Sequence, residues 1–518
     1  MKISVNVITV IYCARYTKVL LNVMPGGMIS FSHSTRETKR AIPDHGAEKR
    51  MNSKYGRLTR QIIKELMTIA GRDSIVTEKA AMEGYARDET PLAKPRAPQV
   101  VVKPSDSPTV ARLLGLANKK MIPVTPRGAG TGLSGGCIPL HGGILLSLER
   151  MNRILEIDRE NFVAVVEPGV TLSDLYTEVE QYGLYYPLYP GEMSATIGGN
   201  IATNAGGMNA IKYGVTRHNV LGLEAVLPNG EIIRTGGKFV KCSTGYDLTQ
   251  LIIGSEGTLA IVTKVILKLT TKPTKRQVLL APFTDLQNAI DAVPDILQLK
   301  VTPTGIEFMD KSVVEIVEKY LGRELPYHQY AAFLMVIMEG ESDDEIYEYF
   351  SKVEDICKQH GAIEAMVPGS ERAKRKLFEA REGVYPAIKK YAPMELLDVV
   401  VPRSEIAKFV RAVKGISHRR QVPVIICGHA GDGNVHLHPI CLNMDSAEWK
   451  RRLPSLMKDI YRAGISFGGA ISGEHGIGLA KKVYFRRETD DAFLKIMMGI
   501  KKAFDPNNIL NPGKIFDL

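Results

Sequence analysis

The glycine-rich segment PRGAGTGLSGG, residues 126–136, limits the fold of this chain more than any other feature. Residues 130–135 give a formal G-x-G-x-x-G match. A Rossmann dinucleotide site requires a helix that begins inside this motif. Here the chain continues as CIPLHGGILLSL, in which Pro139, Gly142 and Gly143 oppose a helix and the sequence runs into a strand. The sequence therefore argues against a Rossmann fold and predicts a loop that leads into a strand.

Two further segments share this chemistry: PGEMSATIGGNIATNAGG at residues 190–207 and GSEGTLAIVTKV at residues 254–265. Glycines leave backbone N–H groups uncovered, and Thr131 and Ser134 add hydroxyl groups to the first segment. Such groups can hold a diphosphate, although an ordinary multi-glycine turn is the alternative for a single loop. Three loops within about 140 residues predict a long, extended ligand. A dinucleotide such as FAD fits this prediction better than a mononucleotide.

A second chemical centre is expected in GHAGDGNVHLH, residues 428–438. The Asp-Gly turn follows an apolar run, so we predict a strand, a turn and a second strand that bring His429 and His436 together. On the second strand the side-chain period of two places His436 and His438 on one face. Neutral imidazoles that lie this close suit a divalent metal such as Zn, Mn or Fe. A hairpin whose histidines only form hydrogen bonds is the alternative.

The pair Glu474–His475 in SGEHGIG favours the metal interpretation. The glycines around this pair allow backbone and ligand to approach closely. Two histidines and one carboxylate would leave coordination positions open for water or substrate.

At 518 residues the chain is longer than one hydrophobic core usually organises, so two or more domains are expected. Hydrophobic residues make up 44% and charged residues 24% of it, which is typical of globular proteins. A strand at residues 98–104 and a helix over Pro108–Lys120 are followed, to about residue 270, by short β-rich runs that alternate with glycine turns. PTKR at residues 273–276 is typical of a linker, and helical segments alternate with strands beyond it. This order predicts an α+β protein whose later part is a helix-backed sheet.

The net charge of +11 does not by itself indicate a nucleic-acid partner. Residues 1–50 contain eight Lys or Arg against three Asp or Glu, which contributes +5 of this charge. The other basic residues are dispersed and form no long run with interleaved aromatic residues. We therefore expect no binding to nucleic acid.

Residues 1–50 show no regular periodicity, and their short apolar run precedes Arg15, an order that a signal peptide does not have. We expect this segment to be a disordered or artefactual extension, with Met28 or Met51 as the first residue of the functional chain. No window approaches the roughly 20 apolar residues of a membrane span. The six cysteines are far apart and form no CxxC pair, which argues against an iron-sulfur cluster or a disulfide framework and fits a reducing cytoplasm.

Six motifs in this order resemble the FAD-linked 2-hydroxyacid dehydrogenases: PRGAGTGLSGG, TIGGNIATNAGG, GSEGTLAIVT, GHAGDGNVH, SGEHGIG and DPNNILNPGKIF. This family includes the glycolate oxidase catalytic subunit, D-lactate dehydrogenases and D-2-hydroxyglutarate dehydrogenases. The resemblance runs from about residue 55 to Leu518. It is specific for the family and not for one substrate.

The resemblance implies an α+β fold of the vanillyl-alcohol oxidase type. An FAD-binding domain of two α+β subdomains is expected over residues 51–272. An α+β cap domain with an antiparallel sheet and the metal site is expected over residues 273–479. Residues 480–518 are expected to pack back on the FAD-binding domain, and residues 1–50 lie outside the resemblance.

The resemblance also implies FAD as a cofactor, with the first glycine loop at its diphosphate and the second loop beside its flavin. Some relatives link FAD covalently through a histidine in the first loop. That loop contains no histidine here, so we expect FAD to be bound non-covalently. The expected cofactor-binding residues are Arg127, Gly128, Ala129, Gly130, Thr131, Gly132, Leu133, Ser134, Gly135, Gly136, Pro190, Ser194, Thr196, Gly198, Gly199, Asn200, Thr203, Asn204, Gly206, Gly207, Glu256, Gly257 and Ile261.

In the metal-bearing relatives, the ligands of one divalent ion correspond to His429, His436 and Glu474, and the catalytic base corresponds to His475. This agrees with the interpretation of the motifs given above. His438 stands where the 2-hydroxyglutarate enzymes carry asparagine. It is therefore a further candidate, either as an added ligand or as a hydrogen-bond donor behind the ligands.

Arg381, in FEAREGVYP, resembles the arginine that holds the substrate carboxylate in this family. A solvated charge among neighbouring Lys and Glu residues is the alternative. The 2-hydroxyglutarate enzymes place a lysine in the strand before Asp398, whereas this chain reads MELLDVVVP there. We therefore expect a small monocarboxylate such as D-lactate or glycolate as substrate.

The expected activity is the FAD-dependent oxidation of a small D-2-hydroxy acid to the 2-oxo acid, by hydride transfer to flavin N5. A metal would activate the substrate hydroxyl and His475 would take its proton. The electrons would pass to an external acceptor: an electron-transferring flavoprotein, a quinone or an iron-sulfur subunit.

Two alternatives stay open: a D-2-hydroxyglutarate dehydrogenase, and the catalytic subunit of a complex linked to an electron-transferring flavoprotein. The intact Glu474–His475 pair disfavours a non-catalytic flavin-binding protein. We expect a homodimer or a hetero-complex in the cytoplasm, without an integral membrane segment. A peripheral position at the inner membrane is an alternative.

Overall fold

The computed structural model describes residues 22–23, 29–30, 54–326 and 328–518. Residues 1–53 and residues 54–518 form separate units. In the first unit, β1 (Asn22–Val23) pairs antiparallel with β2 (Ile29–Ser30). Apart from these four residues, the predicted extension over residues 1–50 lies outside the described residues. The following account concerns residues 54–518.

The first sheet of this unit contains the short buried strands that begin the chain's β-rich part. Its order is β3-β4-β6-β5, and β6 pairs parallel with both β4 and β5. Parallel strands are usually buried on both faces and continuously apolar, as in the VVV of β4. The elements are α2 (Arg60–Ala70), β3 (Ile75–Val76), α3 (Lys79–Met82), β4 (Val100–Val102), α4 (Ser107–Lys119), β5 (Val124–Arg127) and β6 (Ile144–Ser147).

A second, antiparallel sheet follows, in the order β11-β10-β12-β8-β7. Its apolar side chains and those of helices α5 and α6 form one core. The small strands β9 and β13 pair beside it. The elements are β7 (Ile154–Asp158), β8 (Val163–Val166), α5 (Leu172–Glu180), β9 (Leu184–Tyr185), α6 (Ile197–Thr203), α7 (Ala210–Tyr213), β10 (Val220–Val226), β11 (Ile232–Gly236), α8 (Leu248–Ile252), β12 (Ile261–Lys268) and β13 (Thr270–Thr271).

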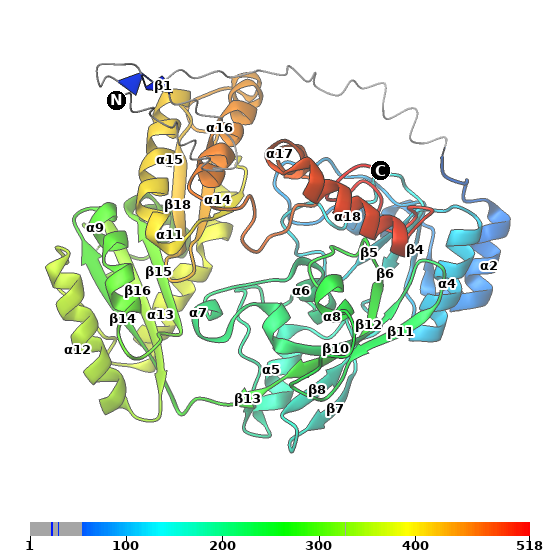
Figure 1. Ribbon diagram of the computed structural model, residues 1–518, viewed down its shortest axis with the longest axis horizontal. Coiled ribbons are helices and arrows are strands. Elements are labelled where there is room, and N and C mark those ends of the chain that lie inside the picture. The colour runs from blue at the N-terminus through cyan, green and yellow to red at the C-terminus, as the bar shows by residue number, and fades with distance from the viewer. Residues whose placement is uncertain (1–21, 24–28, 31–53, 327) are drawn as a thin grey trace, which may run out of the picture. The chain divides into compact units, whose positions relative to one another are not determined.

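The C-terminal segment returns to the first sheet. Helix α18 (Asp491–Phe504), drawn in orange-red in Figure 1, packs on this part of the chain, where Lys501 Nζ donates to the carbonyl oxygens of Thr258 and Leu510. Helix α17 (Lys482–Glu488) instead contacts α16 (Ser446–Ser466), and its Tyr484 hydroxyl lies 3.6 Å from Met457 Sδ. Leu510 forms a parallel bridge with Val124 of β5, and Ile509 and Leu510 are fully buried in the core of this sheet. We call residues 54–272 together with residues 480–518 the cradle region.

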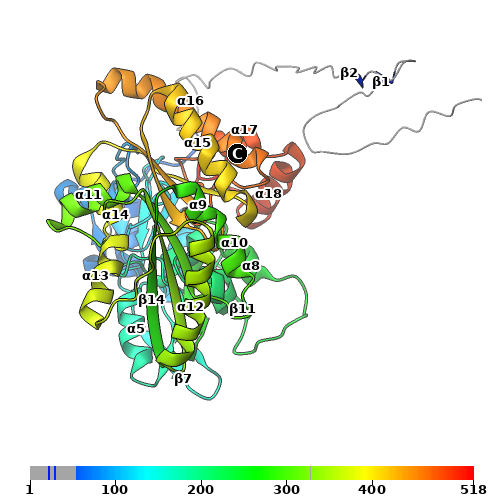
Figure 2. The same ribbon diagram turned by 90° about the vertical axis from the view of Figure 1, so that its left-hand side faces the viewer.

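Residues 273–479 contain a six-stranded antiparallel sheet in the order β14-β16-β15-β18-β19-β17, and we call them the cap region. Helices α9, α10, α12, α15 and α16 pack on one face, and α11, α13 and α14 pack on the other. Figure 2 shows α12 and α13 on opposite sides of β14. The elements are β14 (Lys275–Phe283), α9 (Leu286–Asp291), α10 (Val293–Leu297), β15 (Gly305–Asp310), α11 (Lys311–Leu321), β16 (Ala332–Gly340), α12 (Asp343–Gln359), α13 (Glu371–Glu382), α14 (Val384–Tyr391), β17 (Leu397–Val400), α15 (Ile406–Arg420), β18 (Val424–His429), β19 (Asn434–Pro439) and α16 (Ser446–Ser466).

The register of the cap sheet gathers its polar residues on one face. Glu307 of β15 is paired with His429 of β18, and His436 of β19 is paired with Asp398 of β17. Paired residues and residues two apart on a strand share a face, so these four side chains and that of His438 point to the same side. The predicted strand, turn and strand over GHAGDGNVHLH are confirmed as β18 and β19.

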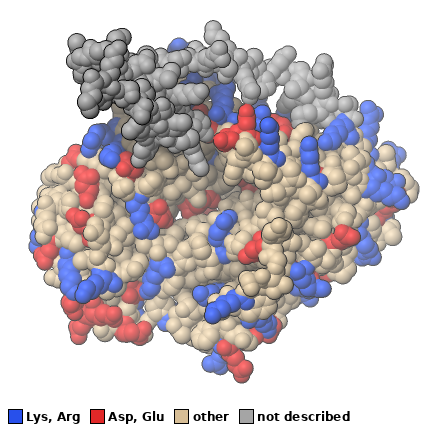
Figure 3. Space-filling model, viewed as in Figure 1, with Lys and Arg blue, Asp and Glu red and all other residues tan. Residues whose placement is uncertain are grey.

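The described residues also test the expectations on charge, membrane spans and cysteines. Lys and Arg alternate with Asp and Glu over the face shown in Figure 3. In residues 54–326 and 328–518, no helix is long and apolar enough to cross a bilayer. The five described cysteines are all free, as the prediction of no disulfide framework requires.

If the C-terminal segment belongs to the core of the first sheet, Leu510→Ala will lower the free energy of unfolding by about 2–5 kcal/mol, because a fully buried leucine is truncated. Leu518, eight residues further on, is 38% exposed, so Leu518→Ala is the matched control and should change this free energy by at most about 0.5 kcal/mol. Urea denaturation of both variants, followed by circular dichroism, measures the effect. Equal shifts in the two variants would contradict the assignment.

Candidate functional site

A cleft in the cradle region is lined by all three glycine-rich segments. Backbone groups of the loop after β5, of α6 and its N-terminal approach, and of the turn before β12 all contribute to its wall. All but four of the residues predicted to bind the cofactor lie in this wall. The cleft therefore joins segments that the sequence separates by more than a hundred residues.

The four other predicted residues have structural roles beside the cleft. Gly135 has φ +78°, and a Cβ there would lie 3.0 Å from Leu479. Ser194 is exposed and its hydroxyl donates to Glu192 at 2.6 Å. Asn204 caps α6 in the left-handed conformation and accepts a hydrogen bond from the backbone N–H of Arg217. At Gly207, with φ +129°, a Cβ would lie 1.9 Å from the carbonyl oxygen of Tyr189.

Several residues that the sequence did not single out also line the cleft. Asp88 and Cys137 lie in its wall, and the backbone N–H of Cys137 donates to Asp88 Oδ2 at 3.4 Å. Asn511 closes one end, because its side-chain amide donates to the carbonyl oxygens of both Gly136 and Glu256. Asn511 belongs to the motif DPNNILNPGKIF, which contributed to the family resemblance but indicated no role for Asn511.

The cleft wall fits a dinucleotide because its glycines are required for close backbone approach. A Cβ at Gly128 would lie 2.2 Å from Thr196 Oγ1, and one at Gly198 would lie 2.6 Å from Cβ of Pro168. A Cβ at Gly136 would meet no atom within 4 Å, so that backbone faces open space. Uncovered amides of this kind are suited to phosphate oxygens.

The three predicted metal ligands converge at the edge of this cleft. Glu474 Oε1 lies 3.4 Å from His429 Nε2 and 3.4 Å from His436 Nε2. The two imidazole rings are nearly perpendicular, with centroids 5.0 Å apart. Two ligand atoms about 2.1 Å from one ion in tetrahedral geometry are about 3.4 Å apart. Glu474 Oε1 therefore lies from each of the two histidine nitrogens at the spacing that ligands of one divalent ion have.

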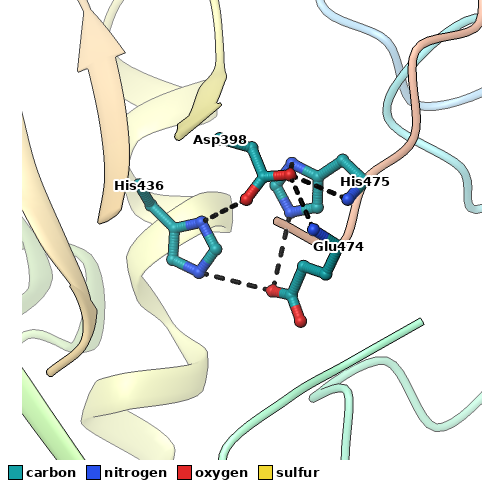
Figure 4. Close-up of side chains that lie close together, drawn as sticks. All are labelled: Asp398, His436, Glu474 and His475. Atoms are coloured by element: carbon teal, nitrogen blue, oxygen red, sulfur yellow. Dashed lines mark hydrogen bonds and ion pairs between the residues drawn. The ribbon is translucent and has the colours of Figure 1, made fainter. Parts of the chain in front are cut away.

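A combination without His429, namely Asp398, His436, Glu474 and His475, brings one ligand atom from each residue within 4.8 Å of the others (Figure 4). However, Asp398 is fully buried and both of its oxygens are occupied. Oδ2 accepts from the backbone N–H groups of Glu474 and His475, at 2.9 and 2.8 Å, and from the Ser472 hydroxyl. Oδ1 accepts from the side-chain amide of Asn434 at 2.7 Å. We therefore treat Asp398 as the residue that holds the ligands and not as a ligand.

Asp398 lies behind two imidazoles (Figure 4). Its Oδ1 is 3.6 Å from His436 Nδ1, and its Oδ2 is 3.8 Å from His475 Nδ1. Burial disfavours the charged form, but the neighbouring His475, Lys481 and His436 outweigh burial and hold the pKa of Asp398 well below its usual value. Burial lowers the pKa of both His436 and His475, so neutral rings present Nε2 toward Glu474.

His429 is held by a buried acid that the sequence analysis missed. Glu307, which has no exposed surface, places Oε1 2.6 Å from His429 Nδ1. Burial opposes protonation of His429, but Glu307 and Glu474 outweigh it and raise the pKa of His429 well above its usual value. The His429 ring therefore carries a proton on Nε2, and a metal cation that binds there has to displace this proton. The only signal for Glu307 was an acid between the apolar residues Ile306 and Phe308 of the strand GIEFMD.

Arg381 is not a solvated surface charge. Its side chain is 11% exposed, and its Nε and Nη2 both lie 2.7 Å from Glu307 Oε2. The carboxylate that it contacts thus belongs to the protein, and its predicted contact with a substrate stays a prediction. The chain of contacts from Arg381 through Glu307 to His429 nevertheless places a guanidinium close behind a candidate ligand.

His438 shares the face of His436 but does not join the converging atoms. Its Nε2 lies 4.0 Å from Cys427 Sγ, and its Nδ1 has no hydrogen-bond partner among the described residues. Burial, followed by the nearby charges of His475 and Arg381, lowers its pKa to about 3. No contact links His438 with Glu474 in the described part of the chain, so its assignment as a ligand stays a prediction.

Glu474 and His475 connect the two centres. Both residues line the cleft that the glycine-rich segments form. The same Glu474 meets His429 and His436 of the cap sheet. A molecule in the cleft would therefore lie directly beside the candidate metal ligands and the candidate base.

Two protein-family profiles match the chain. Residues 98–236 match the FAD binding domain, and residues 272–515 match the FAD linked oxidases, C-terminal domain. An uncharacterized FAD-linked oxidoreductase from Mycobacterium tuberculosis is 45% identical over 453 residues, which cover 86% of this chain and 97% of the relative. D-lactate dehydrogenase from Anaerostipes hadrus is 39% identical, over 89% of this chain and 98% of that protein.

Glycolate oxidase subunit GlcD from Bacillus subtilis is 40% identical, over 89% of this chain and 97% of that protein. Among solved structures, p-cresol methylhydroxylase with bound substrate superimposes with a TM-score of 0.73 at 18% identity, over 91% of this chain and 97% of that chain. An identity this low shows the fold alone. These likenesses confirm the family that the six motifs resemble and the fold that it implies.

The close approach of the loops predicts that Gly128→Ala will weaken FAD binding by about 10- to 100-fold, because the new methyl group must displace Thr196 and overpacking of this kind costs about 1–3 kcal/mol. Gly499→Ala in α18 is the control, since a Cβ there meets no atom within 4 Å. The flavin-to-protein absorbance ratio of the purified variants, with titration of added FAD, measures the effect. An unchanged FAD affinity in Gly128→Ala would contradict the location of the site.

Proposed function

This chain belongs to the FAD-linked oxidoreductases, and on that premise we propose that it oxidises a small D-2-hydroxy acid, D-lactate or glycolate, to the 2-oxo acid. One observation carries the proposal: Glu474 and His475 line the cleft of the glycine-rich segments, and Glu474 also meets His429 and His436. A reaction that uses a flavin and an activated hydroxyl group together requires two such centres to be adjacent.

The cleft residues would hold FAD non-covalently. The segments around Gly128 and Gly198 would surround its diphosphate and flavin with backbone groups, and Asn511 would hold Gly136 and Glu256 in place at one end. FAD, when bound, supplies the acceptor for the hydride that leaves the substrate carbon. An oxidoreductase of this kind also requires an external electron acceptor, for which an electron-transferring flavoprotein, a quinone or an iron-sulfur subunit is proposed.

His429, His436 and Glu474 would hold one divalent ion, Zn, Mn or Fe. When bound, the ion supplies a Lewis acid that lowers the pKa of the substrate hydroxyl group. Glu307 fixes the ring of His429 through Nδ1, and Asp398 lies behind Nδ1 of His436. Carboxylates behind metal-binding imidazoles orient the rings and increase their basicity.

His475 would take the proton of the substrate hydroxyl at Nε2. Burial lowers the pKa of His475, so its ring is neutral and can accept a proton at neutral pH. Asp398 Oδ2 lies 3.8 Å from Nδ1 and would stabilise the imidazolium that forms. We place the ring proton on Nδ1, on the side of the negative Asp398 carboxylate, so that Nε2 is left to accept, although no hydrogen bond joins Nδ1 to that carboxylate.

Arg381 would hold the substrate carboxylate while it remains paired with Glu307. A planar guanidinium can bind two carboxylates on different edges. The strand MELLDVVVP offers no second cation for a distal carboxylate, which supports a monocarboxylate substrate. The relatives named D-lactate dehydrogenase and glycolate oxidase subunit support the same class.

Anaerobic titration with a panel of 2-hydroxy acids tests the substrate directly. We expect D-lactate or glycolate to bleach the flavin absorbance at lower concentration than L-lactate or D-2-hydroxyglutarate, because the site offers one carboxylate-binding cation. Preferential bleaching by D-2-hydroxyglutarate would contradict the monocarboxylate assignment. If no 2-hydroxy acid reduces the flavin, the proposed reaction is wrong.

If His475 is the base, His475→Ala will lower kcat about 100- to 10,000-fold while FAD stays bound, because general bases contribute accelerations of this size. His360→Ala is the control, since His360 pairs with Asp295 at the surface of the cap region. Stopped-flow reduction of the flavin under saturating substrate measures the chemical step. Near wild-type reduction in the His475 variant would remove this residue from the mechanism.

A further inference from the structure

The segment Ser472–Ala480, which we call the EH loop, contacts both regions of the molecule. On the cap side, its backbone N–H groups at Glu474 and His475 donate to Asp398 of β17. On the cradle side, the next residues of the same loop donate to two residues that line the FAD cleft. The EH loop therefore carries Glu474 and His475 of the candidate metal site and is bonded directly to the wall of the candidate FAD site.

Glu256 supplies the first cradle contact. Its Oε1 accepts from the backbone N–H of Ile477 and its Oε2 from that of Gly478, both at 2.7 Å. The side chain is buried, and Glu256 itself lines the FAD cleft. Its backbone is fixed by Ala202 of α6 and by Asn511. One carboxylate thus forms part of the cleft wall and holds the loop that carries Glu474 and His475.

Ser134 supplies the second cradle contact. Its carbonyl oxygen accepts from the N–H groups of Leu479 and Ala480, at 2.7 and 3.1 Å, and Ser134 belongs to the first glycine-rich segment. Glycines make this approach possible: a Cβ at Gly476 would lie 3.0 Å from Glu256 Oε1, and one at Gly478 would lie 2.1 Å from the carbonyl oxygen of Ser134. Both glycines also have positive φ.

A third close approach involves the ligand itself. Gly206, which lines the cleft, would place a Cβ 2.5 Å from Glu474 Oε2. The position of Glu474 is thus limited by the cleft wall on one side and by the histidines on the other. Any displacement of the second glycine-rich segment would move the carboxylate that meets His429 and His436.

We propose that FAD and the divalent ion bind cooperatively, and that Glu256 is the positioning residue that couples them through the EH loop. The inference rests on the FAD and metal sites proposed above. FAD in the cleft restrains Glu256, Ser134 and Gly206, and these residues hold the EH loop with Glu474 in the position that the ion requires. By thermodynamic reciprocity, the bound ion must strengthen FAD binding by the same factor.

The test measures FAD release from the holoenzyme with Mn²⁺ or with a chelator in the buffer. Flavin fluorescence, which rises on release, follows the rate after dilution, and electron paramagnetic resonance of free Mn²⁺ first establishes that the holoenzyme binds this ion. In the wild type we expect chelation to accelerate FAD release by about 10-fold, within the usual range of coupling between two sites.

Glu256→Gln keeps the volume of the side chain but replaces one acceptor oxygen by an amide that cannot accept an N–H group. We expect the ratio of the two release rates to fall to about 1 in this variant. Glu339→Gln is the matched control: Glu339 is also a buried carboxylate between the two regions, but it binds Lys212, Tyr213 and Arg276 and does not touch the EH loop. This control should keep the wild-type ratio.

The outcomes separate the inference from the proposed function. The wild type alone tests the coupling. If FAD leaves it at the same rate with Mn²⁺ and with chelator, the coupling is wrong, even when Mn²⁺ binds and 2-hydroxy acids still bleach the flavin. A wild-type ratio retained in Glu256→Gln overturns the role of Glu256. If the holoenzyme binds no Mn²⁺, the metal assignment is wrong and the coupling is wrong with it.

Discussion

The carboxylate of Asp398 is the interaction on which the site depends. It is fully buried, and an isolated charge in this position would cost several kcal/mol. Hydrogen bonds from the EH loop and from Asn434, with Lys481 Nζ 3.7 Å away, compensate that cost. Because Oδ2 accepts the N–H groups of both Glu474 and His475, one strand of the cap sheet fixes the proposed metal ligand and the proposed base together. The same carboxylate lies 3.6 Å behind Nδ1 of His436.

The fold explains why these residues can meet. Strands β15, β18, β19 and β17 bring their polar residues to one face by register alone, while helices cover the apolar face behind them. The three proposed metal ligands all belong to the cap region, and among its described residues only Glu474 and His475 line the glycine-rich cleft. The EH loop is the only segment among the described residues that takes part in both centres. Glu256 holds the EH loop on the cradle side and Asp398 holds it on the cap side. These contacts together fix the positions of Glu474 and His475.

Local patterns in the sequence were sufficient to predict some parts of this site. The Asp-Gly turn between apolar strands predicted that His429 and His436 would meet, and the glycine spacing predicted a shared cleft. Glu307, Asp398 and Asn511 were missed because their roles arise from contacts with distant segments, as in the bond between Asn511 and Glu256, 255 residues apart. An acid inside an apolar strand, as at Glu307 and Asp398, is the one signal that could have indicated them. For Arg381 the resemblance indicated a carboxylate partner, and only the structure showed the buried contact with Glu307.

The central claim is that His429, His436 and Glu474 hold one divalent ion beside the flavin, while Asp398 holds the ligands from behind. Anomalous diffraction from crystals of the holoenzyme prepared with Mn²⁺ tests this claim most directly. The account predicts one anomalous peak bonded to Nε2 of both histidines and to the Glu474 carboxylate, next to the FAD-filled cleft, with Asp398 outside bonding distance. A peak bonded to Asp398 and His475 instead, or no peak in this cluster, would contradict it.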